Sequence, residues 1–165
     1  MKNIELTQGQ YAIVDDSDFK ELNKHKWCVN WNKKTNEKYA IRVISKKIHP
    51  SGKQTRVSMH GTIVGVIGGG IVDHINHNTL DNRKCNLRIV TKSQNAMNQK
   101  KRSLNTSGSI GVHFIDKLNK WCSTIAVDGH KIHLGLYSNI KNAIESRREA
   151  EIKYFGEYRY KGESV

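Results

Sequence analysis

Short runs of β-branched and aromatic residues alternate with polar segments over the first part of the chain. These runs occupy residues 11–14, 27–31 and 39–44, and they predict three strands separated by polar turns. Residues 16–22 lie between the first two runs and predict a short helix. We therefore expect residues 1–55 to form a β-rich region.

The last third of the chain has a more regular pattern. Residues 111–115, 121–127 and 131–136 predict three strands, and Asp128-Gly129 is a strong signal for a tight hairpin between the last two. An apolar stripe at the helical period follows and predicts a helix whose first residues Ser138 can cap. Residues 110–160 are therefore expected to form a three-stranded antiparallel sheet covered by one helix.

The middle of the chain combines two short strands with a helix. Residues 71–76 and 87–90 have strand composition, and a polar loop separates them. Thr91 and Gln94 have the spacing of a capping box, so a helix should begin there and carry Asn95 in its first turns. The expected fold class is α+β and modular, with this strand–loop–strand–helix unit inside residues 56–99.

Charge and punctuation support this division. The formal net charge is +13, which favours a polyanionic partner over a neutral small-molecule substrate. Residues 71–102 are the most basic stretch for their length. Three glycines precede it at 68–70, and residues 100–109 form a polar, basic linker to the last module.

The composition also narrows the class of protein. With 36% hydrophobic residues the chain can build small cores, and we expect its tryptophans Trp27, Trp31 and Trp121 to lie in them. No apolar run reaches membrane-spanning length and the N-terminus lacks a signal-peptide core, so a cytoplasmic protein with no membrane partner is expected. The three cysteines have no Cys-x-x-Cys pairing, so no zinc site is expected.

The central unit carries the side chains that phosphodiester hydrolysis needs. Asp73 and Asn95 offer the hard oxygen ligands that Mg²⁺ prefers, and His74 can accept a proton near neutral pH. Consecutive residues of a regular strand point to opposite faces. Asp73 and His74 can therefore address one phosphate only at a strand end or an irregular turn.

These residues, together with the Asn86-Leu87 pair, give the central unit a recognisable order. Asp73-His74, then Asn86-Leu87, then Asn95 on the next helix resembles the HNH (ββα-metal) nucleases, in the free-standing phage-type homing endonuclease branch. The resemblance implies that Asp73 and Asn95 hold Mg²⁺ or Mn²⁺, that His74 activates water, and that Asn86 pins the loop.

The resemblance extends to both sides of this unit. Residues 57–60 and 63–65 are similar to the segment that precedes the nuclease core, with Gly61 where that branch has Arg, and His60 is a candidate for a supporting role. The last module is similar to the Apetala/ethylene-response DNA-binding domain at 111–112, 120–121, 132–135 and 155–156. That family places its sheet in the major groove with the helix behind it.

Strand parity then separates two faces of the last sheet. Ile125, Ile132 and Leu134 should face the helix, and the alternating residues should face DNA. Bidentate arginines are missing from the DNA face, so the base preference of the family does not carry over. The DNA-binding candidates of the whole chain are Arg83, Lys84, Arg88, Lys100, Lys101, Arg102, His113, Lys117, Lys120, Thr124, Lys131 and His133.

The sequence thus predicts a site-directed DNA endonuclease of the HNH homing type that acts on duplex DNA. The alternative from another class is a non-catalytic DNA-binding regulator with a degenerate nuclease core. An RNA-directed protein is disfavoured because the sequence has no aromatic stripe of the RNA-recognition type. A monomer is the default expectation, located in the host cytoplasm if the chain is phage-encoded as the resemblance implies.

Overall fold

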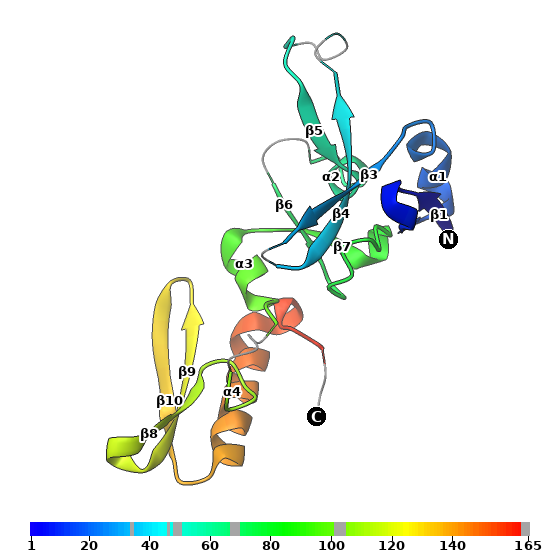
Figure 1. Cartoon of the computed structure of the whole chain (residues 1–165). Coiled ribbons are helices and arrows are strands. Elements are labelled where there is room, and N and C mark those ends of the chain that lie inside the picture. Colours follow the sequence, from blue (N-terminus) through cyan, green and yellow to red (C-terminus); the bar gives the residue numbers. More distant parts are fainter. Residues whose placement is uncertain (34, 46, 48–50, 67–69, 101–104, 163–165) are drawn as a thin grey trace. The chain divides into compact units, whose positions relative to one another are not determined.

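The chain divides into two compact units, Met1–Val90 and Thr91–Val165 (Figure 1). The computed structural model describes residues 1–33, 35–45, 47, 51–66, 70–100 and 105–162. Small antiparallel sheets and helices make up both units, so the α+β class predicted from the sequence is confirmed. Of the helices in the described ranges, none has the length and apolar character to cross a membrane.

The first unit contains three small sheets and two short α-helices. Its elements are β1 (Lys2–Glu5), η1 (Thr7–Gly9), β2 (Tyr11–Val14), α1 (Asp16–Leu22), β3 (Cys28–Asn32), β4 (Glu37–Ile44), β5 (Thr55–Ser58), α2 (Met59–Ile63), β6 (Ile71–His74), η2 (Lys84–Asn86) and β7 (Leu87–Val90). The sheets have the orders β1-β2, β3-β4-β5 and β6-β7. The boundary expected after residue 55 falls inside this unit, since β4 pairs with β5 through Arg42 and Val57 and their neighbours.

The core of the first unit joins the N-terminal hairpin to the segment that leads into the central unit. Ile4, Val14, Trp27 and Met59 are fully buried in one cluster, and Leu80 packs against it from the loop after β6. Trp27 also donates from Nε1 to the Leu22 carbonyl at 2.8 Å, as a buried indole should.

The prediction that Trp31 is a core residue is wrong. Trp31 is 50% exposed, and its Nε1 donates to Asn36 Oδ1 at 3.2 Å across the β3–β4 hairpin. Residue 31 opposes Lys38, one pair before the β3–β4 turn and beyond the last of the buried core side chains. The indole therefore lies on the surface of the hairpin.

The second unit is a short helix followed by a sheet with a long helix against it. Its elements are α3 (Lys92–Met97), β8 (Val112–Ile115), η3 (Asp116–Leu118), β9 (Lys120–Val127), β10 (His130–Tyr137), α4 (Ile140–Phe155) and η4 (Gly156–Tyr158). The strand order is β10-β9-β8, and α4 covers one face (Figure 1). Residues 128 and 129 have φ values of 49° and 83°, which confirms the tight hairpin turn.

The core of this unit lies between the sheet and α4. Ile125 packs with Ala150 and Phe155, and Ile132 and Leu134 pack against them, so the predicted helix-facing residues are confirmed. The register shifts between His133 and Gly135, and this bulge puts Leu136 opposite Cys122. The cap of α4 is Asn139 rather than the predicted Ser138, because Asn139 is the last extended residue and its Oδ1 accepts from Lys141 N at 2.8 Å.

A close approach between β9, α4 and the turn before β8 requires glycine at position 111. Gly111 has φ +78°, and its carbonyl accepts from Thr124 N at 2.9 Å. A Cβ there would collide with the Thr124 carbonyl oxygen and come within 2.8 Å of Arg147 Nη1. That nitrogen donates to the Thr124 carbonyl at 2.6 Å, so these two groups occupy the space that a side chain at position 111 would need.

We predict that Gly111→Ala destabilises the second unit by about 3 kcal/mol, from left-handed backbone strain and overpacking together. Gly108→Ala is the matched control, because Gly108 has φ +77° and nothing within 4 Å of the added Cβ. It should cost only about 1 kcal/mol. Urea unfolding monitored by far-UV circular dichroism measures both changes, and equal losses would contradict the steric account.

Candidate active site

Asp73 and His74 are the last two residues of β6. Both side chains are buried, and the ladder pairs Asp73 with Arg88 and His74 with Leu87. Beyond His74 the chain turns, with His77 N donating to the His74 carbonyl at 2.9 Å and His77 at φ +60°. His74 thus lies at a strand end, the kind of position in which neighbouring side chains are released from strict alternation.

His74 is held among polar and aromatic neighbours. Its Nε2 is 3.4 Å from Asn82 Oδ1, and its ring centroid is 5.2 Å from that of His60 and 6.2 Å from that of Tyr39. Burial lowers the pKa of His74, against the opposing effects of Asn82 and of the Asp73 carboxylate. The imidazole is therefore neutral at neutral pH and able to accept a proton.

His60, the first-turn residue of α2, lies edge-on to His74. Its ring centroid is 5.8 Å from that of Tyr39, and its Nδ1 is buried with no hydrogen-bond partner among the described residues. Burial, and secondarily the neighbouring His74, lower the pKa of His60 to about 4. Burial and the hydrogen bond to Glu37 raise the pKa of Tyr39. All three rings are uncharged at neutral pH.

The structure explains why glycine follows His60. Gly61 N donates to Ser58 Oγ at 3.3 Å, and the Gly61 carbonyl accepts from Val66 N at 2.8 Å. A Cβ at this position would lie 2.7 Å from both Ser58 Oγ and the Val66 carbonyl oxygen. No larger side chain fits at position 61 while these contacts are kept.

Asp73 forms an ion pair with its cross-strand neighbour. Arg88 donates to Asp73 Oδ2 from Nε at 2.9 Å, and its Nη2 lies 2.7 Å from the same oxygen. Both side chains are largely withdrawn from solvent. The negative charge of Asp73 is therefore offset by a guanidinium in this structure.

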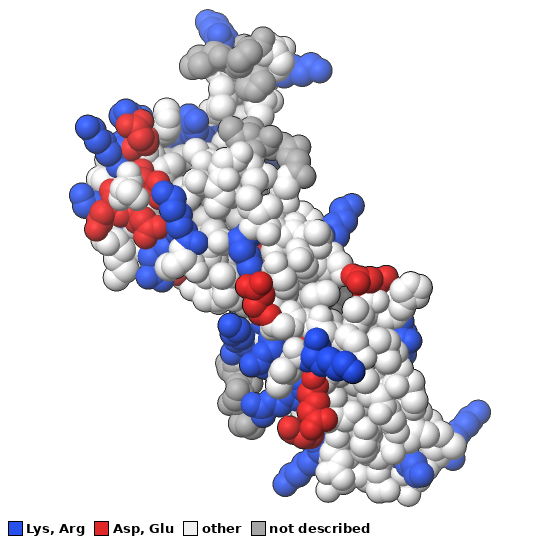
Figure 2. All heavy atoms as spheres, turned by 180° about the vertical axis from the view of Figure 1, so that it is seen from behind, with Lys and Arg blue, Asp and Glu red and all other residues white. Residues whose placement is uncertain are grey.

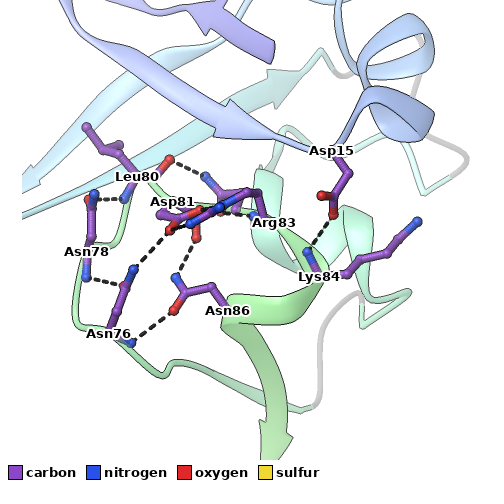
Figure 3. A network of polar contacts seen from close by, with 9 residues as sticks. Asp15, Asn76, Asn78, Leu80, Asp81, Arg83, Lys84 and Asn86 are labelled. Carbon is purple, nitrogen blue, oxygen red and sulfur yellow. Dashed lines mark hydrogen bonds and ion pairs between the residues drawn. The ribbon is translucent and has the colours of Figure 1, made fainter. Parts of the chain in front are cut away.

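The loop between β6 and η2 is built around the carboxylate of Asp81 (Figure 3). Asp81 accepts from Asn76 Nδ2 at 2.9 Å and from Arg83 Nε and Nη2 at 2.8 and 2.7 Å. Asn86 joins the loop's two ends, since its Oδ1 accepts from Asn76 N at 2.9 Å and its Nδ2 donates to the Asp81 carbonyl at 2.8 Å. Hydrogen bonds from Arg83 are the main reason that the pKa of Asp81 is lowered.

The N-terminal hairpin anchors this loop. Ile13 N donates to the Leu80 carbonyl and Asn82 N donates to the Ile13 carbonyl, each at 2.8 Å. Lys84 N donates to Asp15 Oδ2 at 2.8 Å (Figure 3). The side chain of Asn82 contacts His74, and its backbone is held by a segment that is distant in the sequence. The neighbouring contact between Lys84 and Asp15 joins residues 69 positions apart.

Sequence reasoning missed Asp81 and Asn82 as site residues. They are 2% and 1% exposed, although they lie in a polar loop. The available signal was the acid–amide–arginine order at 81–83, in which a carboxylate and a guanidinium two residues apart can pair. That pairing leaves the intervening Asn82 directed toward His74.

The basic candidates of the first unit have acidic partners. Arg83 pairs with Asp81 at 2.7 Å, Lys84 Nζ with Asp18 at 2.7 Å, and Arg88 with Asp73. Figure 2 shows Asp and Glu side chains gathered at the α1 end of this unit, with Lys and Arg side chains among them. The charge of each of these three residues is therefore offset by an acidic side chain within the unit.

Asn95 belongs to the second unit. The capping box is present in full, with Thr91 Oγ1 accepting from Gln94 N and Gln94 Oε1 accepting from Thr91 N, so the predicted helix start is confirmed. Asn95 is half-buried, and its backbone N–H donates to the Thr91 carbonyl at 2.9 Å. Its pairing with Asp73 around one cation stays a prediction.

The remaining DNA-binding candidates fall mainly on one sheet of the second unit. The register puts His113, Lys120, Lys131 and His133 on the face opposite α4, and all four are exposed. Thr124 shares this face but is buried, with its hydroxyl donating to the Gly111 carbonyl at 3.2 Å. Lys117, in η3, and Lys100, after α3, are exposed, whereas Lys101 and Arg102 lie outside the described residues.

Comparison with known proteins identifies the central segment. Residues 64–97 match the family model of the HNH endonucleases, a range that contains Asp73, His74, Asn86 and Asn95. No curated protein and no solved structure matches the chain. The match supports an HNH nuclease, a class that acts on DNA and generally depends on a divalent metal.

We predict that His60 stays neutral down to about pH 4. Its folded-state pKa is lower than the value of about 6.5 in an unfolded chain, so the unfolded chain takes up the proton first. The free energy of unfolding should therefore fall as the pH decreases from about 6.5 to about 4. Titration of the His60 ring resonances by NMR, assigned with His60→Gln, tests this, and a midpoint above pH 6 would contradict the described burial.

Proposed function

We propose that this protein is a site-directed DNA endonuclease of the HNH homing type that hydrolyses phosphodiester bonds in duplex DNA. One observation carries the proposal: a buried histidine follows a buried aspartate at the end of β6, inside the segment that matches the HNH endonucleases. His74 is assigned as the general base and Asp73 as a ligand of the divalent cation.

The surroundings of His74 suit a general base. If the imidazole proton is on Nε2, that nitrogen donates to Asn82 Oδ1, and the basic lone pair is on Nδ1. The lowered pKa keeps the ring unprotonated in the range where a base must act. His60 and Tyr39 limit the rotation of the ring and stay uncharged beside it. His60 is thus assigned a supporting role.

The donor set near His74 fits a hard cation such as Mg²⁺ or Mn²⁺. Within the described ranges, no group of His, Cys, Asp or Glu side chains is assembled for a metal ion. A cation at Asp73 would therefore rely on carboxamide, water and phosphate oxygens for its other ligands, as Mg²⁺ commonly does. Asn95 is the predicted carboxamide ligand. When bound, the cation would offset the charge that develops on the phosphate and the leaving oxygen.

The second unit is assigned to DNA binding. Its exposed sheet face carries Lys120 and Lys131 with His113 and His133, groups that can contact phosphates and groove edges. A three-stranded sheet with α4 against one face is the arrangement that the resemblance to the Apetala/ethylene-response domain implies. Monomeric action in the cytoplasm of a host cell remains part of the proposal.

Plasmid nicking tests the catalytic assignment. With supercoiled plasmid and Mg²⁺ or Mn²⁺, His74→Ala should lower the nicking rate by roughly 10² to 10⁴, the usual contribution of a general base. Asp73→Asn should abolish the metal-dependent rate. His25→Ala is the matched control, because His25 is an exposed histidine of the same unit, and its rate should equal that of the unaltered protein.

Two outcomes of this assay would reject parts of the proposal. Equal nicking by His74→Ala and the unaltered protein rules out His74 as the base. Absence of nicking over a range of sequences and metals, with DNA binding intact, favours the alternative of a DNA-binding regulator with a degenerate nuclease core.

Binding of a short duplex at several salt concentrations tests the role of the second unit. We expect Lys120→Gln and Lys131→Gln each to reduce the slope of log K against log salt by about one, because each removes one phosphate contact. Lys24→Gln is the control, since Lys24 pairs with Glu21 at 2.6 Å. Fluorescence anisotropy gives the slopes, and unchanged values for both sheet variants would remove this face from the interface.

A further inference from the structure

Arg88 and Asp73 differ from the other ion pairs of the first unit. Arg88 donates from Nε to Asp73 Oδ2 at 2.9 Å, and its Nη2 lies 2.7 Å from the same oxygen. Its side chain is 14% exposed, and its partner is the carboxylate that the proposed function assigns to the cation. Two positive groups, the guanidinium and the divalent cation, therefore require the same carboxylate.

The competition follows from charge. A guanidinium that stays on Asp73 offsets the negative charge that would attract the cation. It also repels that cation directly. Both effects are stronger at a buried site than in water, because the dielectric constant there is lower. The paired state of the free protein is thus a state with low affinity for divalent cations.

A DNA phosphate offers Arg88 a different acceptor. Guanidinium groups bind phosphate oxygens in a bidentate manner and pair well with them in partly dehydrated sites. The β6–β7 ladder fixes the Cα of Arg88 opposite Asp73, so a change of acceptor requires only rotation of its side chain. Arg83 is different, because its partner Asp81 is bound simultaneously by Asn76 and structures the loop.

We propose that Arg88 is a positioning residue that exchanges partners: it neutralises Asp73 in the free protein and moves to a DNA phosphate in the complex. Its departure makes Asp73 available to the divalent cation, so cation and DNA bind cooperatively. This inference rests on the proposed function, since it takes Asp73 as a cation ligand.

The test is the affinity for Mn²⁺, measured by electron paramagnetic resonance on the full chain with and without a short duplex. All arms carry His74→Ala so that the duplex remains intact. Arg88→Gln should bind Mn²⁺ at least about tenfold more tightly without DNA, because one positive charge near the ion is removed. The tightening produced by DNA should shrink correspondingly. Arg88→Lys, which keeps the charge, should restore the weak binding.

The controls separate this proposal from the proposed function. Arg56→Gln removes an exposed arginine of β5 in the same unit and should change neither affinity. If Asp73→Asn binds Mn²⁺ as tightly as the parent chain, then Asp73 is not a ligand and the metal assignment itself fails. If Asp73→Asn loses the ion, two results for Arg88→Gln overturn only the partner exchange. Either Arg88→Gln binds Mn²⁺ no more tightly than the parent chain, or it does not bind Mn²⁺.

A measurement on the unaltered protein covers the case in which Arg88→Gln does not fold. The Nε–H resonance of Arg88 in NMR spectra reports its hydrogen bond to Asp73. Addition of Mg²⁺ and duplex together should shift this resonance and change its solvent exchange, compared with either alone. An unaltered Arg88 resonance, while the Asp73 amide shifts with Mg²⁺, would overturn the proposal.

Discussion

The conformation of the loop after β6 depends on the buried carboxylate of Asp81. This group accepts hydrogen bonds from Asn76 and Arg83, and the Asp81 backbone carbonyl accepts from Asn86. Because Asn82 follows directly in the chain, the same arrangement turns its carboxamide toward His74. A buried charge is stable only when it is paired and hydrogen-bonded. The network around Asp81 meets that condition and thereby determines what the candidate base contacts.

Other basic side chains of the first unit are also paired with nearby acidic side chains. The chain has a large positive net charge, yet Arg83, Lys84 and Arg88 each lie against an acidic side chain. Pairs on the surface contribute little to stability, whereas removal of one partner from a buried pair is costly. The Arg88–Asp73 pair belongs to the second kind, and the Arg83–Asp81 pair has a buried carboxylate and a partly exposed guanidinium. Both pairs lie within the segment that matches the HNH endonucleases.

Features with a local cause were predictable from the sequence. The Thr91 capping box and the hairpin at Asp128 follow from a few neighbouring residues, and both are found. The alternating pattern of β9 and β10 likewise gave the faces of the last sheet. The burial of Asn82 was not predictable, because it requires the backbone of Ile13 from a distant hairpin. The exposure of Trp31 depends on where the core ends, and the strand β1 has too few apolar residues to be detected in isolation.

The N-terminal hairpin has a consequence for how this protein can be divided. Its strand β2 supplies both backbone hydrogen bonds to the loop, and its side chains fill the core into which Leu80 packs. A fragment beginning at residue 56 would retain β6, β7 and every proposed catalytic group, but it would expose Leu80 and leave Asn82 without its anchor. The ββα segment therefore cannot be moved to another protein by itself, and any chimera must contain residues 1–90 together.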